Sequence, residues 1–330
     1  MAGALNRPEG PRPEDVKRNA RSFGWIGVAM IGTAAILWVA GSSLVAYRLA
    51  YPPFIEDGHT DVYGPHAPIA DAAAPVNPLA AFGAQFQSVT IPVDGYPAVE
   101  GWFVAGKMPS AVLLMPAAGA NRRAMLPYMK FLHAAGYPML AIGSGDNPES
   151  GTGWGWRERA EVLAAADNLK RRGFANIAAL GVSEGAAAIL LAQAEHPMFS
   201  AIVADSSYRN LAAMFRATPS IAGLNPAFSQ TVMMEAGFLL GHSLWRIDPA
   251  SAARKLAGAA LLVIQNRGDK IVSVADAEAI RNAAQSSSAE LWIVPTDGHG
   301  DAIFEDPDAY ASRVTAFLQS HLPEGARSSQ

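Results

Sequence analysis

Residues 176–192 read NIAALGVSEGAAAILLA and join three patterns in direct succession. Ile177 to Val182 is an apolar run of strand length, a G-x-S-x-G motif overlaps its end, and an alanine- and leucine-rich segment of helical character continues to about Glu195. Such a motif also arises by chance in a glycine-rich chain, but here it lies between a strand pattern and a helix pattern. The stretch therefore predicts a strand, a sharp turn and a helix, with Ser183 in strained backbone geometry at the turn as a candidate nucleophile.

Glycine lies two residues before and two residues after Ser183. A Cβ atom at Gly181 or Gly185 is expected to collide with a neighbouring strand or helix at such a turn. The first amides of the predicted helix would point at an oxyanion that forms beside the serine.

Outward from this stretch, short apolar runs alternate with helical patterns. The predicted strands are residues 86–93, 99–104, 111–115, 138–142, 177–182, 199–204, 260–265 and 289–294, and further helices are predicted at 122–135, 156–172, 274–284 and 307–321. Asp94-Gly95 predicts a hairpin turn between the first two strands. Buried strands that alternate with helices indicate an α/β fold, with a mostly parallel eight-stranded sheet covered by helices on both faces. Residues 206–248 interrupt the alternation without a strand pattern and are rich in Met, Phe and Leu, which predicts a helical cap.

Composition excludes several functional classes. The chain has 330 residues, half of them hydrophobic, a net charge of −4 and no cysteine. Without a long basic run, nucleic acid is not an expected partner. Without cysteine there is no disulfide, no thiolate metal site and no cysteine nucleophile. No H-E-x-x-H motif occurs, so no catalytic metal is expected. The glycine-rich residues 143–155 lack both phosphate-binding motifs and predict a mobile loop beside the active site.

The N-terminal part of the chain predicts a membrane anchor. Trp25 to Tyr47 are 23 consecutive uncharged residues, enough to cross a bilayer, with an aromatic residue at each end. A cleaved signal peptide is the alternative, because Ala40-Gly41-Ser42 could supply a cleavage site. The apolar run continues past that site, which favours an uncleaved transmembrane helix over residues 24–47.

The charges around this segment predict its orientation. Lys17, Arg18 and Arg21 precede it, whereas only Arg48 is basic between the segment and Lys107. By the positive-inside rule the N-terminus is cytoplasmic and the rest of the chain is extracytoplasmic, which means periplasmic in a bacterium. The predicted organisation is a disordered tail at 1–23, the span at 24–47, a Pro/Ala-rich tether at 48–84, a catalytic domain at 85–323 and a C-terminal tail at 324–330.

The sequence from about Phe86 to Leu322 resembles the α/β-hydrolase superfamily, and in particular bacterial membrane-anchored serine hydrolases. The resemblance is carried by the turn at Ser183, the order of strands, and two loops near the C-terminus. One loop, residues 265–272 (QNRGDKIV), carries Asp269 where the family has its triad acid, and residues 295–301 (PTDGHGD) carry His299 after the last strand. The chain order Ser, Asp, His matches the superfamily.

The resemblance implies a Ser183–His299–Asp269 triad, in which His299 takes the serine proton and Asp269 orients the imidazole. The other six histidines lie in the tether, in helices or at helix ends, or in the cap, whereas His299 follows a strand in a glycine-flanked loop. Asp205, directly after the preceding strand, is the alternative acid because some relatives use that position.

The oxyanion hole departs from the family pattern. Relatives usually carry His-Gly after the third strand and often Asn-Arg some residues later; here Asn121-Arg122 matches, and Pro116-Ala117 stands where His-Gly would be. Backbone amides supply the hydrogen bonds, so the loss of the histidine side chain need not abolish the hole. The expected donors are the amides of Ala118 and Glu184, with Ala117 as the alternative in another register.

The resemblance implies a serine hydrolase that cleaves an ester, thioester or amide bond without a cofactor. A small-molecule or lipid-like ester of a fairly apolar acid is the expected substrate, and the cap is expected to line the acyl pocket. A peptidase or acyltransferase with the same triad is one alternative. A catalytically silent, membrane-tethered binding protein is another, favoured only by the changed segment at Pro116-Ala117.

Overall fold

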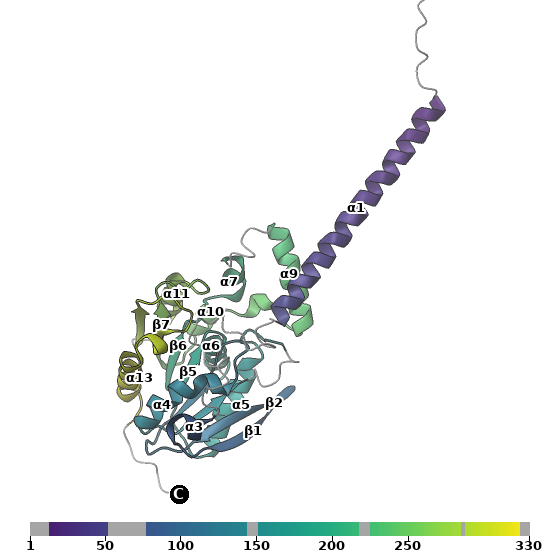
Figure 1. Ribbon diagram of the computed structural model, residues 1–330. Helices are drawn as coiled ribbons and strands as arrows, with labels where there is room; N and C mark the ends of the chain where they lie inside the picture. The colour runs from purple at the N-terminus through teal and green to yellow at the C-terminus, as the bar shows by residue number, and fades with distance from the viewer. Residues whose placement is uncertain (1–12, 52–76, 144–150, 218–224, 285–287, 324–330) are drawn as a thin grey trace, which may run out of the picture.

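The computed structural model describes residues 13–51, 77–143, 151–217, 225–284 and 288–323. An eight-stranded sheet lies at the centre of the main body, and helix α1 (Pro13–Ala50) projects from it as a long rod (Figure 1). Most of the predicted tether and the predicted C-terminal tail lie outside the described residues.

The sheet has the predicted strands in the order β1-β2-β4-β3-β5-β6-β7-β8. Strands β1 and β2 form an antiparallel hairpin, β2 also pairs with β4 in antiparallel fashion, and all pairs from β4 to β8 are parallel. The predicted α/β-hydrolase fold with a mostly parallel eight-stranded sheet is therefore confirmed. The strands are β1 (Gln87–Val93), β2 (Tyr96–Val104), β3 (Ala111–Met115), β4 (Met139–Ile142), β5 (Ile177–Val182), β6 (Ala201–Asp205), β7 (Ala260–Asn266) and β8 (Ala289–Val294).

Helices cover both faces of the sheet because its central strands are apolar on both sides. All five residues of β3 are buried: Leu113 and Met115 pack in the core on one face, and Val112 and Leu114 in the core on the other. The first face is covered by α5 (Glu158–Arg171), α6 (Glu184–Glu195), α10 (Pro249–Ala253) and α11 (Val274–Ala283). The second is covered by the 3-10 turn η2 (Arg122–Met125), α4 (Leu126–Ala134), α12 (Ala302–Glu305) and α13 (Pro307–His321).

The insertion after β6 is helical in its described residues, as predicted. It contains α7 (Leu211–Ala217), α9 (Pro226–Leu240) and the 3-10 turn η5 (Leu244–Arg246). Asn225 caps the start of α9 by accepting the amide of Ala227, and Gly241 with φ of +73° ends it. The cap has its own apolar cluster, which joins α7 and α9 to the catalytic body.

Helix α1 is longer than predicted at both ends. It begins at Pro13, within the tail predicted to be disordered, and runs to Ala50, beyond the predicted end at residue 47. Proline suits the first position of a helix, and residues 14–23 contain good helix formers and no further proline or glycine. Residues Val28–Ala50 form an apolar helical segment long enough to cross a membrane.

The predicted tether contains a helix that belongs to the folded body. Helix α3 (Pro78–Phe82) begins at Asn77, which accepts the amide of Ala80, and ends at Gly83 with φ of +76°. Phe82 lies against α4, with its ring centroid 5.5 Å from that of His133. The packed body therefore starts before the predicted boundary at residue 85, because this one-turn helix has both of its ends capped.

Candidate active site

Ser183 lies at the turn between β5 and α6 with φ of +53° and ψ of −114°. This backbone conformation is strained for a residue that carries a Cβ atom. A Cβ atom at Gly181 would lie 2.5 Å from the amide nitrogen of Ala186, and one at Gly185 would lie 2.4 Å from the carbonyl oxygen of Met115. The expected steric reason for both glycines is thus confirmed, because backbone atoms of the adjacent helix and strand occupy the space.

The structure brings Ser183, His299 and Asp269 into one hydrogen-bonded chain. Nε2 of His299 lies 2.9 Å from Oγ of Ser183, and Nδ1 lies 2.7 Å from Oδ2 of Asp269. All contacting side chains are buried or nearly so. A carboxylate that accepts a hydrogen bond from Nδ1–H leaves Nε2 unprotonated and free to take the proton of the serine hydroxyl. The arrangement can activate a serine nucleophile.

Asp269 is held by a turn that directs its carboxylate toward the imidazole. Oδ1 accepts the amides of Ile271 at 2.8 Å and Val272 at 3.0 Å, and Oδ2 accepts Nε2 of Gln265 at 3.1 Å in addition to the imidazole. These hydrogen bonds fix the position of the carboxylate beside the imidazole. The apolar pair that follows the acid in the sequence therefore contributes backbone amides to the site.

The alternative acid, Asp205, lies at the end of β6 and is bonded elsewhere. Its Oδ1 accepts a hydrogen bond from the hydroxyl of Ser206, and its Oδ2 accepts one from the hydroxyl of Tyr310, each at 2.9 Å. Complete burial raises the pKa of Asp205 to about 6, although these two hydrogen bonds and the nearby His299 act in the opposite direction. Asp269, and not Asp205, is the carboxylate that contacts His299.

Two polar residues at the strand ends fix the histidine loop. Nδ2 of Asn266 donates to the carbonyl oxygen of Gly298 at 2.5 Å, and the amide of Gly300, with φ of +70°, donates to Oγ of Ser206 at 3.2 Å. Neither Asn266 nor Ser206 was among the site residues predicted from the sequence. The available signal was their position, because each lies at or directly after the carboxyl end of a buried parallel strand, where such sheets bind ligands.

The two segments expected to form the oxyanion hole lie next to each other. Gly185 is packed against the carbonyl groups of Met115 and Pro116, which places the segment after β3 beside the serine turn. Ala118 and Glu184 are both buried, and Glu184 is the first residue of α6. The donor roles of Ala118, or Ala117, and Glu184 stay predictions.

The side chain of Glu184 is buried, a point that the sequence left open. Its carboxylate accepts the hydroxyl of Thr152 at 2.8 and 2.9 Å and the amide of Gly155 at 3.1 Å. Residues 151–155, the described end of the glycine-rich segment, are packed on the residue that follows the candidate nucleophile. The rest of the predicted mobile loop, residues 144–150, lies outside the described residues.

Glu184 belongs to a buried acidic cluster with one cation. Arg157 contacts Glu158 at 2.8 Å and Glu161 at 3.3 Å, and Glu158 also accepts the amides of Gly153 and Gly155. Burial, with repulsion from Glu158, raises the pKa of Glu184 well above its ordinary range. Burial and the charge of Glu158 likewise raise the pKa of Glu161 from 4.5 to about 8, against the lowering effect of Arg157. One cation does not offset three buried carboxylates.

This cluster predicts a stability that falls with rising pH. The folded protein holds the Glu161 proton up to about pH 8, whereas the unfolded chain releases it near the ordinary pKa of 4.5. The free energy of unfolding therefore decreases across that window. A Glu161→Gln variant cannot lose the proton, and its melting temperature is expected to fall less between these pH values than that of the wild type. Thermal unfolding at a series of pH values measures this difference, with the partly exposed Glu195→Gln as the control; parallel curves for Glu161→Gln and wild type would contradict it.

His242 in the cap contacts backbone carbonyl groups through both of its ring nitrogens. The ring nitrogens of His242 lie 3.0 Å from the carbonyl oxygen of Leu240 and 3.1 Å from that of Gly153, and burial lowers the pKa of its imidazole. Among the described residues no three His, Cys, Asp or Glu side chains are grouped as metal ligands.

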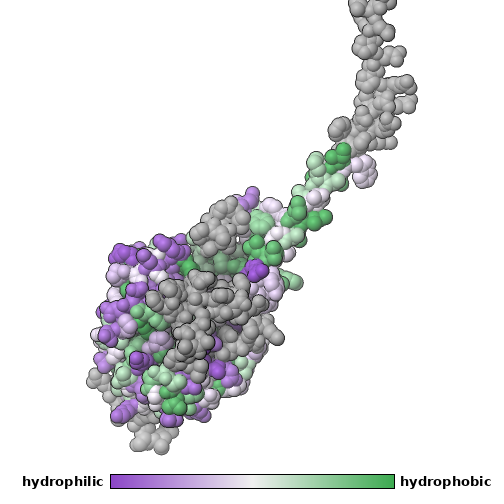
Figure 2. All heavy atoms as spheres, viewed as in Figure 1, coloured by the Kyte–Doolittle hydropathy of each residue, from purple (hydrophilic) through white to green (hydrophobic). Residues whose placement is uncertain are grey.

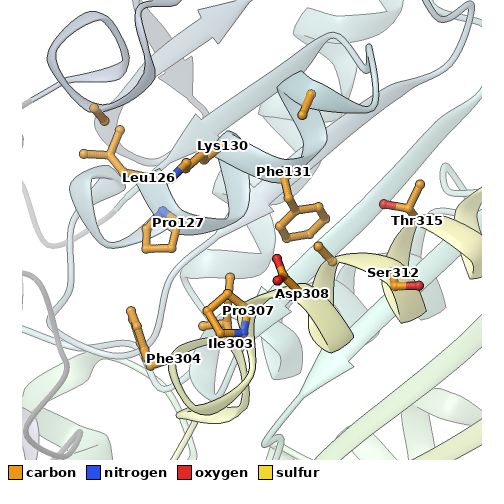
Figure 3. Close-up of a pocket in the computed structure, with 13 residues that line it drawn as sticks. Leu126, Pro127, Lys130, Phe131, Ile303, Phe304, Pro307, Asp308, Ser312 and Thr315 are labelled. Carbon is orange, nitrogen blue, oxygen red and sulfur yellow. The ribbon is translucent and has the colours of Figure 1, made fainter.

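A mostly apolar groove of about 760 Å³ lies between α4 and α13 (Figure 3). Phe131 points into it from α4, and Asp308 and Ser312 border it from α13. The groove is lined by none of Ser183, His299 and Asp269. It therefore does not coincide with the candidate catalytic centre.

Comparisons with known proteins identify a family and similar folds. Residues 151–324, more than half of the chain, match the model of the prolyl oligopeptidase family. An esterase of Pyrococcus furiosus aligns with a TM-score of 0.62 at 21% identity over 76% of this chain and 97% of its own. An acylaminoacyl peptidase of Pyrococcus horikoshii aligns with a TM-score of 0.58 at 13% identity, over 75% of this chain and 43% of its own. Est1E from Butyrivibrio proteoclasticus aligns with a TM-score of 0.54 at 17% identity, over 71% of this chain and 98% of its own. These likenesses show the fold, and no curated sequence matches the chain.

Proposed function

The chain belongs to the prolyl oligopeptidase family of serine hydrolases, and we propose that it cleaves an ester, thioester or amide bond through an acyl-Ser183 intermediate. The observation that carries the proposal is the hydrogen-bonded chain from Ser183 through His299 to Asp269. The strained turn at Ser183 supports it, because strain of this kind is retained where surrounding structure and function require it.

In the proposed mechanism Nε2 of His299 takes the hydroxyl proton of Ser183 while Oγ attacks the carbonyl carbon of the substrate. Asp269 stabilises the imidazolium, and backbone amides at Ala118 and Glu184 stabilise the oxyanion. His299 then returns the proton to the leaving alcohol, thiol or amine. A water molecule, deprotonated by the same imidazole, hydrolyses the acyl-enzyme and releases the acid and Ser183.

We propose an ester of a fairly apolar acid as the substrate. The cap supports this proposal, because its apolar cluster includes residues of α7 and α9 together with Ala187 on α6, the helix after Ser183, and Val272, three residues after Asp269. Tyr208, Leu211 and Phe215 are buried members of that cluster. An acyl chain attached to Ser183 and extending toward the cap would contact apolar side chains of this cluster.

A peptidase is the second candidate, and the family match and the likeness to an acylaminoacyl peptidase favour it. An acyltransferase would share the same acyl-enzyme. Product analysis with a matched ester and amide of one acid, with and without added alcohol, separates the three activities. Release of free acid from the ester alone supports the preferred substrate class.

We propose that α1 anchors the enzyme in a membrane, with the N-terminus in the cytoplasm and the catalytic domain outside. The apolar segment Val28–Ala50 supports the anchor. The basic residues before the segment support the orientation.

The proposal predicts that a fluorophosphonate probe labels the full-length protein at Ser183. The activated hydroxyl displaces the fluoride and forms a phosphonyl ester, which intact-mass spectrometry and peptide mapping detect. Ser183→Ala is expected to abolish labelling, and heat-denatured wild type is expected not to react. Absence of labelling in folded wild-type protein would overturn the proposed hydrolase activity and favour the silent binding protein.

A further inference from the structure

The outer face of cap helix α9 carries no charged side chain. Within its 15 residues the only charge is Glu235, whose Oε1 accepts the hydroxyl of Ser42 on α1 at 2.9 Å. Met234 is 65% exposed and Phe238 is 87% exposed. Leu239 on the same helix is also exposed. Large apolar side chains grouped on one helix face indicate a surface that meets something other than water.

This face adjoins the proposed membrane anchor. Helix α9 lies beside the C-terminal part of α1 in Figure 1, and Figure 2 shows hydrophobic side chains along α1 down to the point where it meets the body. The rings of Trp38 and Phe228 meet edge to face at 5.2 Å, and Nε1 of Trp38 donates to Oγ1 of Thr231 at 3.3 Å. The contacts advance in the same direction along both helices, from Trp38 and Thr231 to Ser42 and Glu235.

Small residues on α1 are buried against the cap and against residues 151 and 152. Ser42, Ala46 and Ala50 are fully buried at four-residue spacing, whereas Leu44 and Tyr47 between them are exposed. A four-residue repeat of small side chains with interhelical hydrogen bonds is the way helices associate within membranes. The single acid of α9 faces its partner helix, which is where membrane proteins place such groups.

The length of α1 before its contact with the cap can be compared with the thickness of a bilayer. Sixteen residues, 22–37, lie between Arg21 and Trp38, the first residue of α1 shown in hydrogen-bond contact with the cap. At about 1.5 Å per residue they extend roughly 24 Å, which is shorter than the hydrocarbon core of about 30 Å. A bilayer that begins after Arg21 therefore extends past Trp38, into the part of α1 that α9 accompanies.

We propose that the outer face of α9 lies in the same membrane leaflet as the C-terminal part of α1, so that the cap of the enzyme is membrane-embedded. The proposal rests on the membrane anchor of the proposed function. It places the apolar cluster beneath α9, which reaches toward Ser183 and Asp269, at the lipid surface. The substrate would then enter from the lipid phase, which suits an ester of an apolar acid.

Single-cysteine spin labelling tests the proposal directly, because the chain contains no native cysteine. Full-length Met234→Cys and Phe238→Cys variants are labelled and reconstituted in phosphatidylcholine vesicles. Ile36→Cys reports on α1 itself, and Ala316→Cys, at an exposed position of α13, is the aqueous control. Collision with oxygen, which concentrates in lipid, is compared with collision with a water-soluble nickel chelate at each position. Circular dichroism verifies that each variant is folded.

The expected oxygen-to-nickel ratio is several-fold higher at positions 36, 234 and 238 than at 316. A high ratio at 36 with aqueous values at 234 and 238 would overturn the embedded cap and leave the anchor standing. Aqueous values at 36 would overturn both. Protection of 234 and 238 from both collision partners would indicate a protein contact, such as a second copy, and would also overturn the proposal. None of these readouts depends on catalysis, so failure of the proposed hydrolase activity remains distinguishable.

Discussion

Ser183→Ala and His299→Ala are each expected to lower kcat by roughly 10⁴- to 10⁶-fold, and the double variant is expected to lose no more than either single one. The serine hydroxyl is a weak nucleophile without a base, and the imidazole nitrogen 2.9 Å away is placed to take its proton in the acylation step. Neither residue supports acylation without the other, so the losses of kcat in the two single variants are not additive. Steady-state hydrolysis of a chromogenic ester by the four proteins measures the cycle.

Ser110→Ala is the matched control, because Ser110 is also a buried serine but lies directly before β3, at the opposite end of the strand from the oxyanion segment. It is expected to leave kcat within a small factor of wild type. Additive losses for Ser183 and His299 would mean that the two side chains act separately. That result would contradict the hydrogen-bonded unit even if both single variants were weak.

Asp269→Asn is expected to lower kcat by roughly 10⁴-fold, whereas Asp205→Asn is expected to have a much smaller effect on kcat. The neutral amide introduced at position 269 would no longer accept the Nδ1 proton as a charged partner, so the imidazole would lose the tautomer that leaves Nε2 free. Asp205 instead accepts the hydroxyls of Ser206 and Tyr310. Its amide variant would lose part of this buried network and is expected to lower the melting temperature.

The two aspartates form a matched pair, since both are acids that follow or end neighbouring parallel strands. Ester hydrolysis and thermal unfolding of both variants separate the catalytic effect from the structural one. A larger loss of kcat in Asp205→Asn, in protein that remains folded at the assay temperature, would make Asp205 the acid of the triad. Equal losses would assign neither residue alone.

Much of the fold could be predicted because its signals are local. The apolar runs of β3 and β5 are buried on both sides, so their pattern is continuous and easily distinguished from the helices between them. The turn at Ser183 requires glycine at positions 181 and 185, and the G-x-S-x-G motif marks both positions locally, although part of the steric reason lies in the neighbouring strand β3. The short helix α3 was missed, although Asn77-Pro78 and Gly83 were available as its start and end signals.

The candidate site was predictable for a related reason. Ser183, Asp269 and His299 each follow a parallel strand, and the carboxyl ends of such strands meet at one edge of the sheet. Chain order and loop position were enough to propose the set of residues. The choice between Asp205 and Asp269 as the contact of His299 required distances, since both acids come from neighbouring strands at the same edge.

The order of helices and strands, the motif of the serine turn and the apolar character of α1 can be read from local patterns, because each depends on residues close together in the chain. The burial of Glu184 with Glu158 and Glu161, and the contacts of Ser42 and Trp38 with the cap, became visible in the three-dimensional structure alone. Those side chains are brought together from segments that are far apart in the sequence, by the packing of α5, α6, α9 and α1. Burial of a charge and contact between distant helices depend on what covers a residue in space, and no local pattern records that.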